Sequence, residues 1–128
     1  MNPAAELLSR DSFSQWLGIK LISVSDANCV TQMKVTKDML NGFGVCHGGV
    51  LFSLADSCMV FSTIKPDLVQ YSIESQISYF KSVALGELLE ARSERIHDSN
   101  RLSRFSIRIQ SIEQKEELAR VYGTVYKL

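Results

Sequence analysis

One isolated carboxylate stands in the most apolar stretch of the chain. Asp56 is the only formally charged residue between positions 39 and 64, and its neighbours are small or apolar. Apolar residues fall on every side of the helix predicted for this stretch, so we expect that helix to be buried on most of its faces. Burying a carboxylate is costly unless another group pairs with it. Asp56 is therefore the first candidate for a catalytic group.

His47, Gly48 and Gly49 stand where this helix is predicted to begin. Glycine permits close approach of another backbone or a ligand, and the free N–H groups of a first helical turn can bind an anion or a polarised oxygen. The two glycines also fit close packing of the helix against a sheet, and both interpretations can apply together. His47 fits equally well as a simple polar residue at the helix N-terminus.

Two other chemistries find less support in the residue pattern. Cys46 beside His47 could indicate a thiol nucleophile, but adjacent side chains at a helix start point apart. Cys46, His47, Cys58 and His97 lack the spacing of a metal site, and we expect neither a metal nor a cofactor. The chain has three cysteines and no CxxC pair, which favours a reducing, cytoplasmic environment over a disulfide framework.

Length, composition and charge limit the classes of protein to which this chain can belong. The 128 residues predict one domain, spanning residues 1–128, and 45% of them are hydrophobic, enough for a core. Fourteen basic residues balance fourteen acidic ones, so we expect no nucleic-acid partner. Residues 39–64 are long enough to suggest a membrane span, but the central Asp56 and four glycines at the start of the stretch argue against one. The N-terminus is too polar for a signal peptide.

Hydrophobic periodicity predicts an α+β protein. We expect a short helix over residues 6–16, a hairpin from strands at 19–24 and 30–35, a loop at 37–46 and a long helix at 47–64. Four further strands are predicted at 69–80, 88–96, 101–111 and 118–126. Residues 69–80 alternate apolar and polar side chains with a period of two. A long apolar helix cannot remain alone, so a curved antiparallel sheet of about six strands should wrap around it.

This order of elements, together with one motif, resembles the hotdog-fold acyl-CoA thioesterases. Residues 47–56 read HGGVLFSLAD, Asn41 lies upstream, and residues 17–21 read LGIKL. The sequence is most similar to the PaaI-like group of phenylacetic acid degradation, and the resemblance extends over nearly the whole chain. The resemblance implies the hotdog fold and thioester hydrolysis without a cofactor.

The resemblance also implies roles for four catalytic residues. Asp56 corresponds to the catalytic carboxylate, acting as general base or as nucleophile. Gly48 corresponds to the backbone N–H that polarises the thioester carbonyl. Asn41 corresponds to a loop amide that positions the water or the aspartate, and His47 to a residue beside the thioester.

Three further residues are implied to bind substrate. Gly49 follows the oxyanion donor, and Ser72 is similar to a serine that helps to hold the water. Lys81 corresponds to a basic residue near the CoA phosphates. Related sequences usually carry a proline shortly after this basic residue, whereas this chain continues with Ser82 and Val83, so its loop should differ in shape.

The sequence thus predicts hydrolysis of an aryl- or medium-chain acyl-CoA to the free acid and CoA, with phenylacetyl-type substrates favoured. A non-catalytic acyl-CoA-binding regulatory module and a hotdog dehydratase or hydratase are the alternatives. Gly48 and Asp56 are eight residues apart, about 12 Å along a helix, so one active site needs both chains of a homodimer. The resemblance implies pairing of such dimers into a homotetramer.

Overall fold

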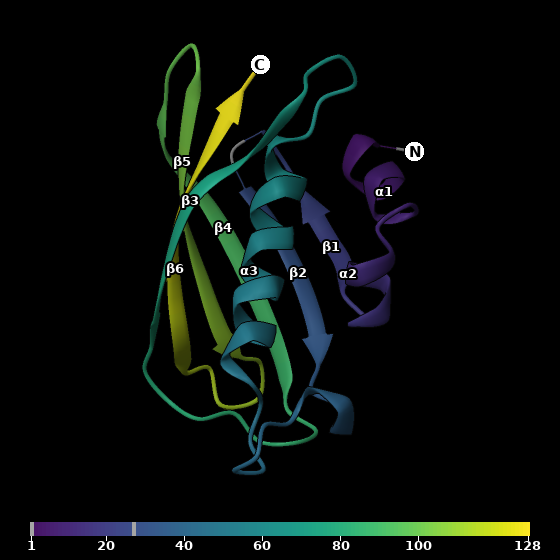
Figure 1. Ribbon diagram of the computed structural model, residues 1–128, viewed down its shortest axis with the longest axis vertical. Coiled ribbons are helices and arrows are strands. Elements are labelled where there is room, and N and C mark those ends of the chain that lie inside the picture. The colour runs from purple at the N-terminus through teal and green to yellow at the C-terminus, as the bar shows by residue number, and fades with distance from the viewer. Residues whose placement is uncertain (1, 27) are drawn as a thin grey trace.

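The structure is a computed structural model that describes residues 2–26 and 28–128, and its main feature is one six-stranded antiparallel sheet (Figure 1). The strands lie in the order β1-β2-β4-β5-β6-β3, which places β1 and β3 at the two edges. Their bounds are Lys20–Val24 for β1, Asn28–Lys34 for β2, Gln70–Tyr79 for β3, Leu88–Asp98 for β4, Leu102–Ser111 for β5 and Glu117–Lys127 for β6.

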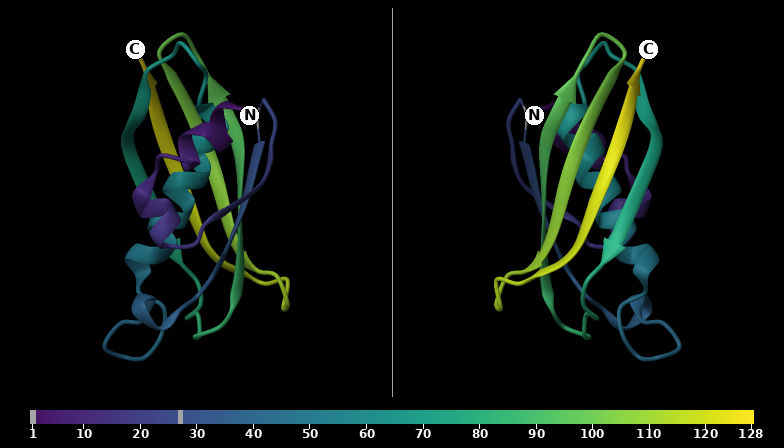
Figure 2. Two further views of the ribbon diagram at one scale, coloured as in Figure 1. Left: turned by 90° about the vertical axis from the view of Figure 1, so that its right-hand side faces the viewer. Right: turned by 90° about the vertical axis from the view of Figure 1, so that its left-hand side faces the viewer.

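The long helix α3, Gly48–Thr63, lies in the concave side of this sheet (Figure 2). Leu54, Ala55, Cys58 and Met59 have no solvent exposure, because they pack onto the inward apolar residues of the strands. The α+β architecture and the sheet curved around one helix confirm the sequence prediction. Within residues 2–26 and 28–128, no helix combines the length and apolar character that a membrane crossing requires.

The N-terminal segment differs from the single helix predicted over residues 6–16. It forms two short helices, α1 at Pro3–Leu8 and α2 at Ser12–Trp16, and both lie against the side of α3 (Figure 2). The break arises at Asp11, whose carboxylate accepts a hydrogen bond from the Ser14 N–H and caps a new helix. Leu17 is buried, but Phe13 and Trp16 are exposed, so these three residues do not share one buried face.

The loop between β2 and α3 begins with a short 3₁₀ helix, η1 at Lys37–Met39. It continues through residues 40–47, where Leu40 and Cys46 form an isolated antiparallel bridge. This loop delivers His47 to the N-terminus of α3, and its His47 N–H donates to the Met39 carbonyl at 2.8 Å. The predicted loop therefore carries more regular structure than its sequence suggested.

Strand β3 departs from the regular alternation read in its sequence. Its pairing with β6 shifts between Ser72 and Glu74, so Ile73 is the extra residue of a β-bulge. Without the bulge, Ser72 and Ser75 would lie on opposite faces of the sheet; with it, both line the same cleft beside α3. The apolar side chains of Tyr71 and Ile73 are exposed instead of buried.

Candidate active site

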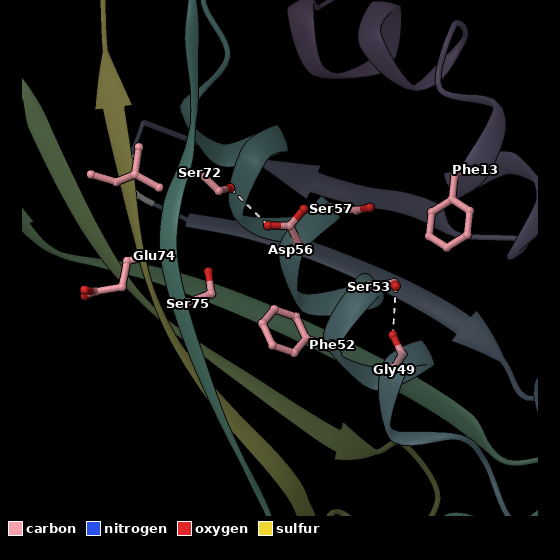
Figure 3. Close-up of a pocket in the computed structure, with 10 residues that line it drawn as sticks. Phe13, Gly49, Phe52, Ser53, Asp56, Ser57, Ser72, Glu74 and Ser75 are labelled. Carbon is pink, nitrogen blue, oxygen red and sulfur yellow. Dashed lines mark hydrogen bonds between the residues drawn. The ribbon is translucent and has the colours of Figure 1, made fainter. Parts of the chain in front are cut away.

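Asp56 lies half-buried at the middle of α3, on the face that looks toward edge strand β3. The Ser72 hydroxyl of β3 donates a hydrogen bond to the Asp56 carboxylate at 3.0 Å (Figure 3). The aspartate is therefore paired, as a carboxylate in an apolar helix requires, and its partner crosses from the sheet to the helix. The helix is open on this side, so the sequence prediction of a deeply buried carboxylate was too strong.

A cleft of about 540 Å³ opens beside Asp56 (Figure 3). Its lining comes from α2, α3 and β3, and none of the ten described residues that line it is lysine, arginine or histidine. They are Phe13, Gly49, Phe52, Ser53, Asp56, Ser57, Ser72, Ile73, Glu74 and Ser75. Such a surface suits an acyl group and a water molecule, and it offers nothing to neutralise a phosphate.

At the N-terminus of α3, the groups that are available for chemistry are backbone N–H groups. His47 is the N-cap, and its Nδ1 accepts a hydrogen bond from the Gly49 N–H at 2.9 Å. The Val50 N–H donates to the His47 carbonyl at 2.9 Å. Among the described residues, the Gly48 N–H has no acceptor, so it is the donor left for an incoming oxygen.

Tyr79 covers this helix end, a contact that the sequence did not predict. Its hydroxyl donates to the Gly48 carbonyl at 2.9 Å. A Cβ atom on residue 48 would lie 2.8 Å from the Tyr79 hydroxyl oxygen, so any larger residue would require the Tyr79 ring to shift. Partial burial raises the pKa of Tyr79, which keeps its proton available for this hydrogen bond. The glycine therefore serves close packing, as one of the two interpretations of the sequence expected.

Lys81 lines a separate hollow of about 350 Å³ together with Gly48 and Tyr79. Its ammonium group forms an ion pair with both carboxylate oxygens of Glu116 at 2.8 Å. The lysine thus lies on the same side of the molecule as the helix N-terminus, at the rim of a different hollow from that of Asp56. Its charge is shared with Glu116 in the free protein.

Asn41 organises the loop that precedes α3. Its side-chain oxygen accepts hydrogen bonds from the N–H groups of Phe43 at 2.9 Å and Val45 at 3.3 Å. Its own N–H donates to the Val45 carbonyl at 2.8 Å. Asn41 does not line the cleft of Asp56 in the same chain.

The predicted site residues therefore fall into two groups within one chain. Asp56, Ser72 and Gly49 line the cleft, whereas Gly48 and Lys81 line the hollow at the helix N-terminus. Eight residues of helix separate Gly48 from Asp56, a rise of about 12 Å. The sequence reasoning missed Tyr79, and it did not foresee that Phe13 and Ser57 would line the cleft.

The Cys46 thiol shows no sign of nucleophilic activation, and the Cys58 thiol has no solvent exposure at which a substrate could reach it. Burial, with a smaller contribution from Glu87, raises the pKa of Cys46 to about 11, so this cysteine is a neutral thiol at physiological pH. The buried Cys58 thiol donates to the carbonyl oxygens of Cys29 at 3.4 Å and Ala91 at 3.5 Å. Within the described part of the chain, no three potential metal ligands form a cluster.

Comparison with known proteins places this geometry in a family. Residues 43–118 match the model of the Thioesterase superfamily. The chain is 31% identical over 112 residues to the acyl-coenzyme A thioesterase PaaI of Escherichia coli, covering 88% of this chain and 80% of the relative. It is 30% identical over 102 residues to 1,4-dihydroxy-2-naphthoyl-CoA hydrolase of Listeria monocytogenes, covering 77% and 82%.

A solved structure agrees with the sequence comparison. The E. coli PaaI protein of the phenylacetic acid degradation operon superposes with a TM-score of 0.93 at 28% identity, covering 98% of this chain and 91% of that one. The matched segment includes α3, β3 and the end of the loop that carries His47, so the residues of both groups lie within it, whereas Asn41 precedes it. The chain belongs to the thioesterase superfamily and is a thioester hydrolase of the hotdog fold.

Proposed function

We propose that the protein hydrolyses an aryl- or medium-chain acyl-CoA to the free acid and CoA, with phenylacetyl-type substrates favoured. The observation that carries this proposal is the Asp56 carboxylate, held by Ser72 in a cleft with two phenylalanines and no basic side chain. The names of two relatives, an acyl-coenzyme A thioesterase and an aryl-CoA hydrolase, support the same substrate class. A cytoplasmic role in the breakdown of aromatic acids fits the three free cysteines.

Asp56 acts on the thioester in one of two ways. As a general base it takes a proton from water, whose oxygen adds to the carbonyl carbon. As a nucleophile it forms an acyl anhydride that water then hydrolyses. In both routes the carbon–sulfur bond breaks, and CoA leaves as a thiol after taking up a proton. Ser72 holds the carboxylate and the attacking water in position.

The Gly48 N–H stabilises the oxyanion that develops on the carbonyl oxygen. His47 keeps the Gly49 N–H occupied and so directs the substrate oxygen to Gly48, while Gly49, which has no side chain, leaves room for the His47 ring. Asn41 shapes the loop that presents this helix end and turns its amide toward the reacting water. Lys81 exchanges Glu116 for a CoA phosphate when substrate binds.

This mechanism requires two chains. A carbonyl oxygen at Gly48 lies beyond the reach of Asp56 in the same chain, since catalytic contacts measure about 3 Å. Edge strand β3 offers unpaired backbone groups and the exposed apolar residues Tyr71 and Ile73 to a second copy, and the exposed Val69 directly precedes it. A two-fold homodimer joins Asp56 of one chain to Gly48 of the other and forms two sites. Such dimers then pair into a homotetramer.

The orientation that we propose for the bound substrate is based on the Asp56 cleft and the Lys81 hollow. The acyl group enters the cleft beside Asp56, where apolar and hydroxyl groups gather. The CoA moiety extends toward Lys81 and the helix N-terminus of the other chain. This arrangement places the reacting carbonyl between the two groups of residues.

A thiol-release assay tests the proposed function. Wild-type protein is incubated with phenylacetyl-CoA, benzoyl-CoA and hexanoyl-CoA, and free CoA is measured with a thiol-reactive dye, with the Asp56→Asn variant as control. We expect CoA release by the wild type and almost none by the variant. Tight acyl-CoA binding without release would indicate the regulatory module instead. Addition or loss of water at an enoyl-CoA double bond would indicate a hydratase or dehydratase.

A further inference from the structure

The wall of the Asp56 cleft opposite β3 comes from the N-terminal segment. Phe13 of α2 faces this cleft, and its side chain is 53% exposed although the helix is anchored to the core (Figure 3). We propose that Phe13 is a specificity-determining residue whose ring packs against an aromatic acyl group. This inference rests on the proposed function. It assigns the enzyme's selectivity for the acyl group to one residue outside the motif at residues 47–56.

A hydrogen-bond network holds α2 in place next to the catalytic aspartate. The Ser14 hydroxyl donates to the Asp11 carboxylate at 2.7 Å, and it lies 2.8 Å from the hydroxyl of Ser57. Because the single hydroxyl proton of Ser14 goes to Asp11, Ser57 must donate to Ser14. Ser57 directly follows Asp56 on α3, so the network fixes Phe13 relative to the reacting carboxylate.

The network is shielded from water, which makes it a rigid support. Ser14 is only 1% exposed, and its carbonyl oxygen accepts the Ile19 N–H at 3.0 Å. An exposed aromatic ring on such a support loses little freedom when a ligand packs against it. Phe13 therefore differs from a ring on a loose terminus, which would have to be ordered by the substrate.

The chemistry of the cleft favours an aromatic ligand. Phe13 and Phe52 both line it, whereas its polar groups are hydroxyls and carboxylates. Two aromatic rings attract each other in offset or edge-to-face geometry, beyond the effect of buried area. A linear acyl chain contacts Phe13 only through dispersion and burial. Replacing the ring should consequently weaken aromatic substrates more than linear substrates of similar size.

Trp16 provides a matched control. It lies on the same short helix, its ring stacks with that of Phe13 at a centroid distance of 6.1 Å, and it is even more exposed. Trp16 does not line the cleft. A substitution there perturbs α2 without removing the ring that faces the substrate.

The test compares two substrates in four proteins. We measure kcat/KM for phenylacetyl-CoA and hexanoyl-CoA in the wild type, Phe13→Leu, Phe13→Ala and Trp16→Leu. Both Phe13 variants should lower the phenylacetyl-to-hexanoyl ratio about fivefold, the size expected for a lost aromatic pair. Trp16→Leu should keep the ratio within about twofold, as for a surface change. The leucine variant retains apolar volume, so the test stands if the alanine variant folds poorly.

The proposal would be overturned by an unchanged phenylacetyl-to-hexanoyl ratio in both Phe13 variants, whether kcat/KM stays constant or falls equally for both substrates. A binding measurement separates this failure from failure of the proposed function. In the Asp56→Asn background, calorimetry gives the Kd of each acyl-CoA with and without Phe13→Leu. The proposal predicts that Phe13→Leu weakens the binding of phenylacetyl-CoA more than that of hexanoyl-CoA. If the wild type shows no turnover, the function is wrong, and these Kd values still decide the role of Phe13.

Discussion

The middle of α3 and its N-terminus offer different kinds of groups to the proposed reaction. At the middle these are side chains: Asp56 and Ser72 are hydrogen-bonded beside an open cleft of about 540 Å³. At the N-terminus it is the backbone: the Gly48 N–H has no acceptor within the described residues, and Tyr79 covers the glycine. A side chain can be changed atom by atom, whereas a backbone donor is altered by changing the packing around it or is removed outright by proline.

This difference predicts how the middle of α3 and its N-terminus should respond to mutation. The acid is supported by one hydroxyl and is otherwise free to react, so its loss removes chemistry and little structure. The donor is held by close packing, so its loss disturbs local structure as well. If the two halves act in one site across a dimer, damage to either should abolish the same reaction.

The largest effect is expected from Asp56→Asn. The amide keeps the shape and the contact with Ser72 but cannot accept a proton or attack a carbonyl. We expect kcat to fall about 10²–10⁴-fold, the range for a lost general base, with KM and the unfolding transition nearly unchanged. Steady-state kinetics measures kcat and KM, and thermal denaturation measures the unfolding transition. A variant that retains more than half of the wild-type kcat would end this assignment.

A smaller loss is expected when the packing around the backbone donor changes. In Gly48→Ala, the new methyl group would lie 2.8 Å from the Tyr79 hydroxyl oxygen, so the ring must move. We expect kcat to fall about tenfold, less than for complete loss of an oxyanion donor. Adding Tyr79→Phe removes the closest atom and should restore part of the activity. If the double variant is as slow as Gly48→Ala, the Tyr79 contact is not what constrains residue 48.

The thiols next to both regions should be dispensable for turnover. Cys46→Ala and Cys58→Ala should keep nearly full kcat, because neither thiol has a base to activate it and burial raises the pKa of Cys46 to about 11. Cys58→Ala should lower the free energy of unfolding by about 1 kcal/mol, through lost packing in the core. Loss of turnover in a folded Cys46→Ala protein would restore the thiol as a candidate nucleophile.

The smallest effect is expected at a third region, beyond the C-terminal end of α3. Hydrogen bonds from Lys127 and Ser103 lower the pKa of Asp98 from 3.8 to about 2. A lowered carboxyl pKa stabilises the fold above pH 4, and this stabilisation is lost as the pH falls from about 4 to 2. Lys127→Met should cost about 0.5 kcal/mol at pH 7, since the Asp98 carboxylate of the pair is exposed to solvent.

Denaturant unfolding at several pH values checks this expectation. The difference between wild type and Lys127→Met should narrow below pH 4 and nearly vanish at pH 2, while kcat at pH 7 stays unchanged. A difference that is constant with pH would show that the pair does not set the pKa of Asp98. A change in kcat would show that this region is coupled to the site.

The sequence predicted the fold because its signals are local. Alternation, the turn residues and the apolar run around Asp56 each report on a few neighbouring residues, and together they indicated six strands around one helix. The motif at residues 47–56 singled out Asp56 and Gly48 for the same reason. The break between α1 and α2 was missed because Asp11 fits either inside the segment or as a second cap.

The remaining parts of the site depend on contacts far apart in the sequence. Tyr79 meets Gly48 across 31 residues, and Ser14 meets Ser57 across 43. No local pattern marks either pair. The bulge at Ile73 is similar: the alternation of residues 69–80 is interrupted by three polar residues, Glu74, Ser75 and Gln76, but this interruption alone does not locate a shift in pairing. That shift lets Ser72 and Ser75 line the same cleft.

The central claim is that Asp56 of one chain and Gly48 of its partner form one active site. Subunit complementation tests it most directly. Asp56→Asn and Gly48→Pro chains carry different affinity tags, exchange subunits and are purified in two steps, so that only mixed dimers remain. Proline removes the N–H of residue 48 and is tolerated at a first helical position, although its Cβ also requires the Tyr79 ring to shift. Circular dichroism of this variant checks that the helix content is kept.

Each mixed dimer would contain one doubly damaged site and one intact site. The account predicts that the two inactive parents regain about half of the wild-type kcat per mixed dimer, as two independent sites require. Verified mixed dimers that stay inactive would contradict it, because Asp56 and Gly48 would then not meet across the interface.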